Sequence, residues 1–433
     1  MKRTVLGLVA LLLLRLPAPA VAAPDDRAWV ELTGRGAELR LATHASACPE
    51  AQLDGRATPM AVRARPSPGF PLLLCQLGAP EGVHRASVGD WTAPLPSRHI
   101  RRVLIFGDTG CRLKGAAVQA CNDPTKWPFP LVVKMAARHR PDLVIHVGDY
   151  YYRETACPAG VAGCAGSPYG DNWTAWDADF FAAAEPLLAE APWIFVRGNH
   201  ESCSRGGEGW FRLLDAAAEP ASCPAESAAF SVRIGDLALD VVDGADADDT
   251  LARHDGVERF SAQLDSFGPS LARGHNWILT HRPIWGQVAV GRLGPLGPIE
   301  VPLNATEQEA VRGRDLSGVQ MVVSGHIHHF ASFTFAGDRP AQLIVGTGGD
   351  VGEAADRPQP KASRADIDGM SADAFTFAQF GYLLLERSGA GWAGDFRNFE
   401  DRPVAACQLR ERRLSCRAVG DMGRRAEASG QPR

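Results

Sequence analysis

Five short apolar runs recur along the middle of the chain, and each leads directly into a loop rich in Gly, Asp, Asn or His. Helical patterns separate the runs. This alternation of strand, loop and helix is typical of an α/β core whose functional residues gather where the strands end. The five runs are Arg102–Phe106, Leu143–Val147, Trp193–Val196, Trp277–Thr280 and Val319–Val323.

The rest of the pattern predicts how this core is covered. Residues 331–399 alternate as strands do, and residues 29–98 contain short strands broken by Pro and Gly. We therefore expect two mixed β-sheets flanked by helices, preceded by a small β-rich N-terminal domain. The expected helices are 131–139, 174–189, 209–218, 257–271 and 304–312, and the expected later strands are 331–335, 343–345, 382–386 and 392–396.

The N-terminus resembles a secretory signal peptide. Lys2 and Arg3 precede ten apolar residues (5–14), and small residues at 20–23 match an A-x-A cleavage site. The apolar run is too short to span a membrane, although Arg15 at its end leaves a retained anchor as an alternative. Cleavage near residue 23 removes three positive charges and takes the formal charge from −5 to −8. We expect an exported protein, secreted or periplasmic, without stable membrane insertion.

Composition and linkers suggest how the chain is divided. Its slightly acidic balance argues against a nucleic-acid partner, which normally requires a basic excess. The proline-containing segment 92–97 is a plausible linker. The expected parts are a signal peptide over 1–23, the β-rich domain over 24–97, a core over 98–400, and a C-terminal hairpin and disordered tail over 401–433.

Ten cysteines fall into five pairs that are local in sequence. An oxidising compartment favours disulfides, and because no C-x-x-C spacing occurs, a structural zinc site is not expected. A catalytic cysteine would need a free thiol, and an even count leaves none over. The expected disulfides are Cys48–Cys75, Cys111–Cys121, Cys157–Cys164, Cys203–Cys223 and Cys407–Cys416.

The loops after the five runs carry side chains of the types that bind metals. A Gly-Asp pair after a strand is by itself most often a turn, so each short motif alone is weak evidence. Five such motifs in one order are hard to obtain by chance. They are Gly107-Asp108-Thr-Gly110, Gly148-Asp149-Tyr-Tyr-Tyr152, Gly198-Asn199-His200-Glu201, Ile278-Leu-Thr-His281 and Gly325-His326-Ile-His328.

With these motifs the chain resembles the calcineurin-like metallophosphoesterases and, among them, the purple acid phosphatases. The family motifs D-x-G, G-D-x-x-Y, G-N-H-D/E, V-x-x-H and G-H-x-H all stand here, with Ile278 where Val is frequent. The resemblance spans roughly residues 100–400. It implies a four-layer αββα sandwich that holds two metal ions.

The resemblance also implies which residues hold each metal. A phenolate with carboxylates suits Fe(III), and imidazoles with an amide oxygen suit a divalent Fe, Zn or Mn ion. Ordinary members of the superfamily have His where Gly110 stands and lack the tyrosine, so Tyr152 indicates the purple type; the alternative is that Tyr152 is a packing residue. The implied ligands are Asp108, Asp149, Tyr152 and His328 for the first metal, with Asp149 bridging, and Asn199, His281 and His326 for the second.

Further roles follow from the same resemblance. His200 would donate a proton to the leaving group or stabilise charge, unless it only orients its loop. Arg197 and Arg282 are candidates for neutralising the substrate phosphate, although arginines beside metal ligands often pair with carboxylates. Many purple acid phosphatases have another histidine before the last motif, and none lies between His281 and His326 here. The insert over 154–171 could be part of the pocket rim or a surface loop.

The function implied is that of an exported binuclear phosphohydrolase acting on phosphorylated small molecules. A metal-activated hydroxide would attack phosphate monoesters, and no protein nucleophile is required. A phosphodiesterase or nucleotide-directed hydrolase on the same scaffold is one alternative. A metal-bound binding protein without catalysis is another. The natural substrate and the oligomeric state do not follow from the sequence.

Overall fold

The computed structural model describes residues 26–292, 298–351 and 359–420. The predicted signal peptide over 1–23 and the end of the predicted tail, 421–433, lie outside the described residues. In the described ranges, no helix is long and apolar enough to cross a membrane.

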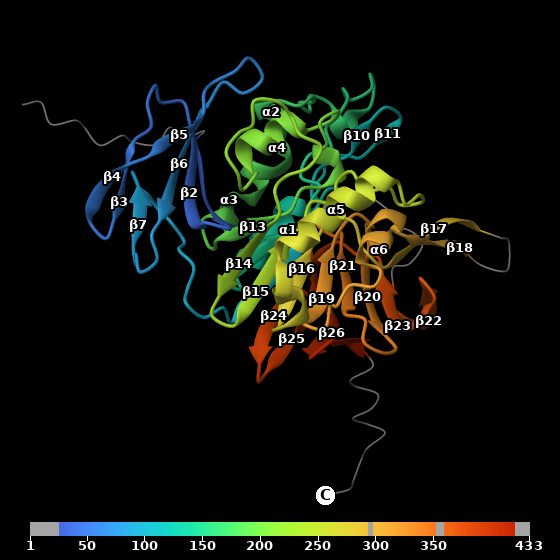
Figure 1. The fold of residues 1–433 in the computed structure, drawn as a ribbon. Coiled ribbons are helices and arrows are strands. Elements are labelled where there is room, and N and C mark those ends of the chain that lie inside the picture. The colour runs from blue at the N-terminus through green and yellow to red at the C-terminus, as the bar shows by residue number, and fades with distance from the viewer. Residues whose placement is uncertain (1–25, 293–297, 352–358, 421–433) are drawn as a thin grey trace, which may run out of the picture.

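Two large β-sheets pack face to face (Figure 1). The larger one has parallel strands β9, β12 and β13 at its centre. Antiparallel strands extend it on both sides. In spatial order it contains β27 (Arg413–Ala418), β26 (Pro403–Arg410), β25 (Gly391–Asn398), β24 (Gly381–Ser388), β9 (Arg102–Phe106), β12 (Leu143–His146), β13 (Trp193–Phe195), β1 (Arg27–Thr33), β2 (Gly36–Thr43), β6 (Leu73–Ala79) and β5 (Ala61–Ala64).

The smaller sheet is also mixed, with β15, β16, β19 and β21 parallel to one another. Its order is β14 (Phe230–Ile234), β15 (Leu237–Val241), β16 (Asn276–Leu279), β19 (Val319–Ser324), β21 (Ala341–Val345), β20 (Phe330–Phe335), β23 (Met370–Phe377) and β22 (Lys361–Ile367). The remaining strands form minor sheets: β10 (Leu113–Lys114) with β11 (Ala117–Val118), β17 (Gly286–Arg292) with β18 (Pro298–Leu303), and β4 (Arg56–Pro59), β3 (Glu50–Leu53), β7 (Ala86–Val88) and β8 (Trp91–Thr92).

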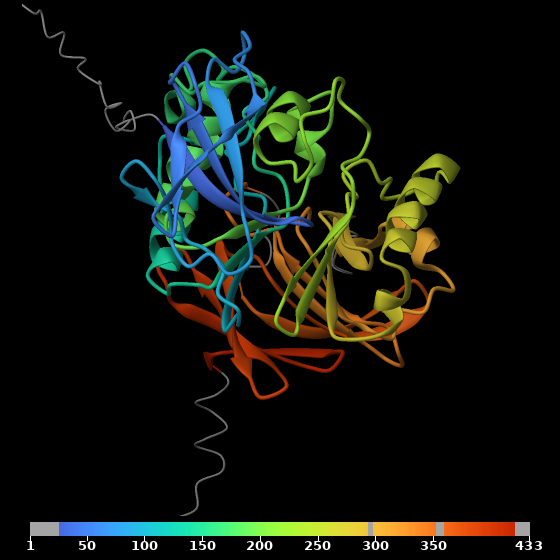
Figure 2. The ribbon, with the colours of Figure 1, turned by 60° about the vertical axis from the view of Figure 1, so that its left-hand side comes forward.

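Helices cover the outer face of each sheet, which confirms the predicted αββα sandwich (Figure 2). Between the sheets, side chains such as Ile105 and Val147 belong to the same buried cluster as Leu279 and Val323. The first helical layer contains α1 (Phe129–Ala137), α2 (Trp173–Trp176), the π-turn Asp177–Phe181, α3 (Ala182–Leu188) and α4 (Gly207–Leu213). The second contains α5 (His254–Ser266) and α6 (Ala305–Val311), and the 3₁₀ turns are Ala162–Cys164, Asn199–Glu201 and Gly268–Ala272.

The five predicted core strands are confirmed as β9, β12, β13, β16 and β19, with ends that shift by one or two residues. All five are almost entirely buried, as expected for strands covered on both faces. Strands β14 and β15 were not predicted, whereas β22 and β23 lie within residues 331–399, which were predicted to form strands. In β15 the buried Asp240 interrupts the apolar run, so its sequence lacks the signal of a central strand.

The residues before 98 are rich in strands, as predicted, but four of these strands belong to the larger sheet. Strand β1 pairs in parallel with β13, and β2, β6 and β5 follow it outward. The domain boundary near residue 97 stays a prediction. The predicted C-terminal hairpin is formed by β26 and β27, with Cys407 directly opposite Cys416.

All five predicted disulfides are confirmed, and none of the ten cysteines is free. Each of the bridges joins residues between 7 and 27 positions apart in the chain. Such bridges stabilise loops and hairpins locally.

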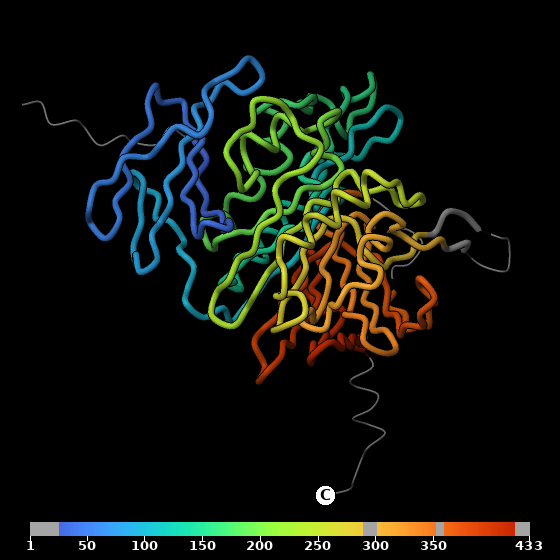
Figure 3. The backbone as a smooth tube through the Cα atoms, viewed as in Figure 1, coloured from blue at the N-terminus to red at the C-terminus, as the bar shows by residue number. Residues whose placement is uncertain are grey.

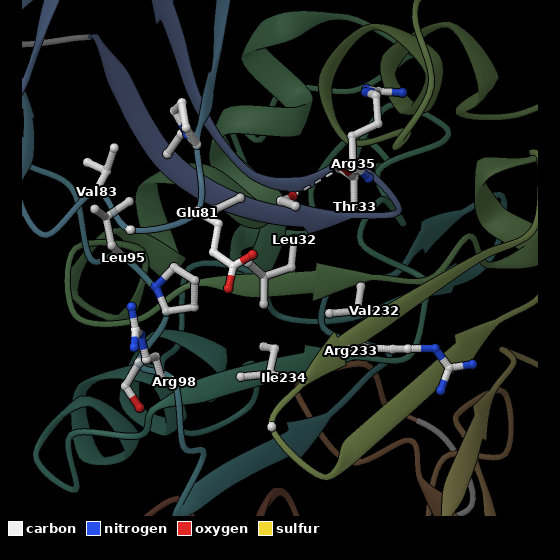
Figure 4. A pocket seen from close by; sticks show the side chains of 18 of the residues that line it. Leu32, Thr33, Arg35, Glu81, Val83, Leu95, Arg98, Val232, Arg233 and Ile234 are labelled. Carbon is white, nitrogen blue, oxygen red and sulfur yellow. Dashed lines mark hydrogen bonds between the residues drawn. The ribbon is translucent and has the colours of Figure 1, made fainter. Parts of the chain in front are cut away.

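A hollow of about 1030 Å³ lies where the turn after β1 and the segment 79–84 face the hairpin β14–β15 (Figure 4). Leu32, Val232 and Ile234 give it apolar walls, and the carboxylate of Glu81 points into it. No predicted site residue lines this hollow.

Helix α4 lies beside the N-terminal strands (Figure 3). Two arginines of these strands donate hydrogen bonds to the end of the helix. Arg40 donates to the carbonyls of Leu213 (2.9 Å) and Asp215 (2.8 Å). Arg63 donates to three carbonyls of the same turn, including that of Arg212 (2.8 Å). These bonds satisfy carbonyls that a helix end leaves without partners.

We predict that Arg40→Met lowers the free energy of unfolding by about 3–5 kcal/mol, the usual cost of removing one partner of a buried ion pair. Arg40 is fully buried, and its NH1 lies 2.6 Å from Oε2 of Glu31. Urea denaturation with the disulfides intact measures the loss. Arg35→Met is the control, because Arg35 is 58% exposed in its pair with Glu38 and should cost less than about 1 kcal/mol. Equal losses in both variants would contradict the prediction.

Candidate metal centre

The predicted ligands meet because their strands are parallel neighbours. Strands β9, β12 and β13 lie side by side in one sheet, and β16 and β19 lie side by side in the other. Side chains that follow the carboxyl ends of parallel strands share one edge of the sheet. Both sheets bring these edges together at the same end of the sandwich.

Three of the predicted ligands have an unusual backbone. Asp108, Asp149 and His326 have φ values of 58°, 60° and 67°. Non-glycine residues in this left-handed region cost about 1–3 kcal/mol and persist only where neighbours hold them. Asp108 is held on both sides, since its N–H donates to Gly148 O (2.9 Å) and its carbonyl accepts from the N–H of Asp350 (2.9 Å). These turns direct the side chains across the strand ends.

Asp108, Asp149, Tyr152 and His328 come together, as the sequence predicted. The Tyr152 hydroxyl lies 2.8 Å from Asp149 Oδ2, 3.2 Å from Asp108 Oδ1 and 3.0 Å from His328 Nε2. His328 Nε2 is also 3.2 Å from Asp108 Oδ1. These four side chains form the first donor group.

Asp149 also belongs to a second donor group. Its Oδ2 lies 3.2 Å from His281 Nε2, which in turn is 3.1 Å from Asn199 Oδ1. One donor atom from each of Asp149, His281 and His326 lies within 4.8 Å of the others. The structure thus brings together all seven residues predicted as ligands, with Asp149 common to both groups.

The chemistry of the donors fits two metal ions. Asp108 and Asp149 are 0% and 1% exposed, and the Tyr152 ring is fully buried between them. Burial, followed by the two carboxylates, raises the pKa of Tyr152 well above its usual value. Anionic groups buried this closely are costly unless a cation lies among them. Carboxylate, phenolate, imidazole and amide donors are also the types such cations require.

Gly110 has to be a glycine in this arrangement. A Cβ at this position would lie 2.7 Å from Tyr150 O and 2.8 Å from Cδ2 of Tyr152. A larger side chain here would displace the tyrosine. Gly110 therefore leaves the space that Tyr152 occupies.

His200 lies at the edge of the donors and is 6% exposed. Its N–H donates to Asp149 Oδ1 (2.8 Å), and its ring lies 3.7 Å from the Tyr152 ring centre to centre. Nδ1 is 2.9 Å from Oε1 of Glu154 and 2.7 Å from NH2 of Arg205. Burial lowers the pKa of His200 to about 4, although Asp149 and Glu154 favour the protonated ring.

The sequence reasoning did not assign Glu154 or Arg205 to the site. Glu154 begins the predicted insert, and its carboxylate pairs with both His200 and Arg205. Burial opposes ionisation, but these two partners lower the pKa of Glu154 to about 2. The insert thus contributes one carboxylate to the site, whereas its Cys157–Cys164 bridge encloses a mostly exposed turn.

Glu201 accepts hydrogen bonds from the backbone of the loops that carry the candidate ligands. Its carboxylate accepts the N–H groups of Gly198 (3.0 Å), Asp149 (3.0 Å), Tyr150 (2.8 Å) and Tyr151 (3.1 Å). It is fully buried, and burial followed by the charge of Asp149 raises the pKa of Glu201 to about 8. This one side chain links the loops after β12 and β13.

Two further aspartates contact ligand histidines and were also missed. Asp350 Oδ2 lies 3.0 Å from His328 Nδ1, and Asp249 Oδ2 lies 3.1 Å from His326 Nε2. Burial raises the pKa of Asp350 to about 6, against the effects of His328 and Arg112. Asp350 follows β21, which overlaps the predicted strand 343–345, so the signal that marked the five motifs was present in the sequence for it. Asp249 follows β15, whose sequence lacks that signal.

The two arginines predicted to bind phosphate lie in different surroundings. Arg282 pairs with Asp249, and its NH1 is 2.9 Å from His326 Nε2. The side chain of Arg197 is fully buried, donating to Glu201 O (3.0 Å) and Ala225 O (2.9 Å) and pairing with Asp243 (3.2 Å).

A cavity of about 320 Å³ opens beside the second donor group. A small ligand entering it would meet His326 and His328 together with Asp249. Its lining is completed by Val288, Leu303 and Ile327.

Comparisons with known proteins agree with this geometry. Residues 101–330 match the model of the calcineurin-like phosphoesterase family. No curated protein sequence matches the chain. Among solved structures, the purple acid phosphatase PPD1 from yellow lupin (Lupinus luteus) seeds is similar, with 16% identity and a TM-score of 0.50 over 92% of this chain and 75% of that one. GAP50, the anchor in the inner membrane complex of Plasmodium, has 14% identity and a TM-score of 0.45 over 72% of this chain and 89% of that one.

At this identity the lupin structure shows a shared fold and leaves the activity open. The family model, by contrast, covers more than half of the chain and includes all seven candidate ligands. The chain therefore belongs to the calcineurin-like phosphoesterase family of metal-dependent phosphohydrolases.

Proposed function

We propose that this metallophosphoesterase is an exported binuclear enzyme of the purple acid phosphatase type that hydrolyses phosphate monoesters. The observation that carries the proposal is the position of Asp149. Its Oδ2 lies 2.8 Å from the Tyr152 hydroxyl and 3.2 Å from His281 Nε2, so a single carboxylate joins a tyrosine-containing group to a histidine-rich one. The two groups have the hardness expected for Fe(III) and for a divalent Fe, Zn or Mn ion.

In this proposal the two groups divide the ligands between them. When bound, two metal ions supply a nucleophile derived from water and positive charge for the phosphate. Asp149 is shared between them, and no protein nucleophile is needed. Asp108, Tyr152 and His328 would hold the first ion, and Asn199, His281 and His326 would hold the second.

We propose that His200 donates a proton to the leaving group or stabilises its charge. Its Nε2 is 3.9 Å from Asp149 Oδ2, which places one ring edge beside the donors. Glu154 holds Nδ1 on the opposite edge, and Arg205 lies against the ring. The ring is thus fixed in orientation, as a residue that donates a proton or stabilises charge at the leaving oxygen requires.

Of the two candidate arginines, we propose that Arg282 neutralises the substrate phosphate. It contacts Asp249 and His326, which both line the cavity, and is 13% exposed. We propose that Arg197 instead stabilises the loop that carries Asn199, because its guanidinium is occupied by Glu201 O and Asp243.

Export is supported by the five disulfides, which persist in oxidising compartments. The signal-like sequence over residues 1–23 gives the route.

We predict that His200→Ala lowers kcat for p-nitrophenyl phosphate by about 10²–10⁴-fold, the usual contribution of a positioned acid. Metal content, measured by elemental analysis, should stay at the wild-type level because His200 is not a ligand. His44→Ala is a matched control, since His44 is exposed and lies outside the donor groups. Activity of His200→Ala within threefold of the wild type would reject the assignment.

We predict faster turnover of p-nitrophenyl phosphate than of bis(p-nitrophenyl) phosphate. The second ester group of the diester must fit beside Val288 and Leu303 in the 320 Å³ cavity. Steady-state kinetics with both esters compare the two classes. A preference for the diester would establish the phosphodiesterase alternative, and no turnover of either ester with two metals bound would favour a binding protein.

We predict that the purified protein contains iron and has a visible tyrosinate-to-Fe(III) charge-transfer band that Tyr152→Phe removes. The phenolate of Tyr152 is the only tyrosine oxygen within reach of both Asp108 and Asp149 among the described residues. Tyr151→Phe is the control, since the Tyr151 hydroxyl donates to Arg153 O instead. A colourless, iron-free but active protein would place the enzyme outside the purple type.

A further inference from the structure

The three histidines proposed as ligands differ in what holds the second ring nitrogen. A metal-binding imidazole uses one nitrogen for the metal, and a partner of the other nitrogen fixes the ring and its tautomer. For His281 this partner is a main-chain carbonyl, because Nδ1 is 2.8 Å from Val147 O. For His326 and His328 it is a carboxylate.

Asp350 lies directly behind His328. The Nε2 of His328 faces the first donor group, 3.2 Å from Asp108 Oδ1, and Nδ1 is 3.0 Å from Asp350 Oδ2. Asp350 is 1% exposed, and the guanidinium of Arg112 holds it in place, with Nε 3.0 Å from Oδ1. The Arg112 guanidinium also lies over the Tyr152 ring, 5.2 Å from its centre.

Asp249 contacts His326 as Asp350 contacts His328, but the two ring nitrogens exchange roles. The Nε2 of His326 is 3.1 Å from Asp249 Oδ2, which leaves Nδ1 for the second donor group. Arg282 pairs with Asp249 as Arg112 pairs with Asp350. Each of the two histidines is therefore backed by an aspartate that is itself fixed by an arginine.

We propose that Asp249 and Asp350 are positioning residues, one for each metal subsite, that set the affinity of the second and of the first metal separately. A carboxylate partner fixes the tautomer of the ring and makes its metal-facing nitrogen more basic. The two aspartates follow different strands, β15 and β21, and each contacts its own histidine and its own arginine. Changing one should therefore leave the other subsite intact. This inference rests on the proposed two-metal function.

Binding of Co²⁺ to the EDTA-treated full-length protein tests the proposal without any substrate. Visible absorption counts the equivalents bound and measures the affinity of each. We expect Asp350→Asn to weaken one equivalent by about 10–100-fold and Asp249→Asn to weaken the other by the same factor, as for other partners of ligand histidines. Wild-type affinity for both equivalents in both variants would overturn the proposal.

Asp401→Asn is the matched control. Asp401 Oδ1 lies 2.8 Å from His139 Nε2 and 3.2 Å from Arg397, so the same Asp–His–Arg contact is broken away from every proposed ligand. Both Co²⁺ equivalents should bind as in the wild type. A loss equal to that in Asp350→Asn would show a general effect on folding and overturn the assignment.

A double-mutant cycle separates positioning from mere stability. In a His328→Ala background, Asp350→Asn should cause no further loss of Co²⁺ affinity, whereas Asp249→Asn should keep its full effect. Additive losses for Asp350 and His328 would overturn the proposal. If thermal unfolding shows that Asp350→Asn does not fold, Arg112→Met takes its place. It removes the cation that holds Asp350 and should weaken the same equivalent.

Failure of the proposed function would look different. A wild-type protein that binds two Co²⁺ equivalents but hydrolyses no phosphate ester would overturn the function and leave the positioning roles standing. Normal hydrolysis together with unchanged Co²⁺ affinities in both variants would overturn the positioning roles alone.

Discussion

The Asp149 carboxylate is 1% exposed and lies within hydrogen-bonding distance of Tyr152 and His281. A carboxylate taken out of water costs several kcal/mol unless positive charge or hydrogen bonds compensate it. The His200 N–H donates a hydrogen bond to Oδ1, and the side chains around Oδ2 are of the types that could hold a metal ion. Glu201 and the N–H of His200 hold Asp149 in position.

Buried polar groups connect the loops that carry the donors. Glu201 accepts four backbone N–H groups and so fixes the turn of Asp149 to the turn of Asn199. Positive φ values at Asp108, Asp149 and His326 are maintained by bonds such as the one between Asp108 N–H and Gly148 O. Strain of this kind is common at functional sites, where the surroundings over-determine the backbone.

The N-terminal strands also contact the elements on either side of the loop that carries Asn199. They extend the larger sheet through β1 and β13, and Arg40 and Arg63 fasten the end of α4. That helix follows the loop with Asn199, His200 and Glu201. The predicted N-terminal domain thus shares the larger sheet with the strands that lead into the candidate site.

The sequence alone determined the local features. Each apolar strand and the motif after it are neighbours in the chain, so the short motifs carry the family resemblance that implies the αββα sandwich and the seven candidate ligands. The local spacing of the cysteines predicted the disulfides. Tertiary structure decided which side chains stand behind those ligands. Arg112 and Asp350 are 238 residues apart in the chain, and Glu154 and His200 are 46 residues apart, so no local pattern pairs them. Only the folded chain shows that Arg197 is buried, that Asp249 and Asp350 contact His326 and His328, and that β1 pairs with β13. Packing and hydrogen bonding across a sheet do not depend on separation along the chain, so the sequence pattern does not reveal these contacts.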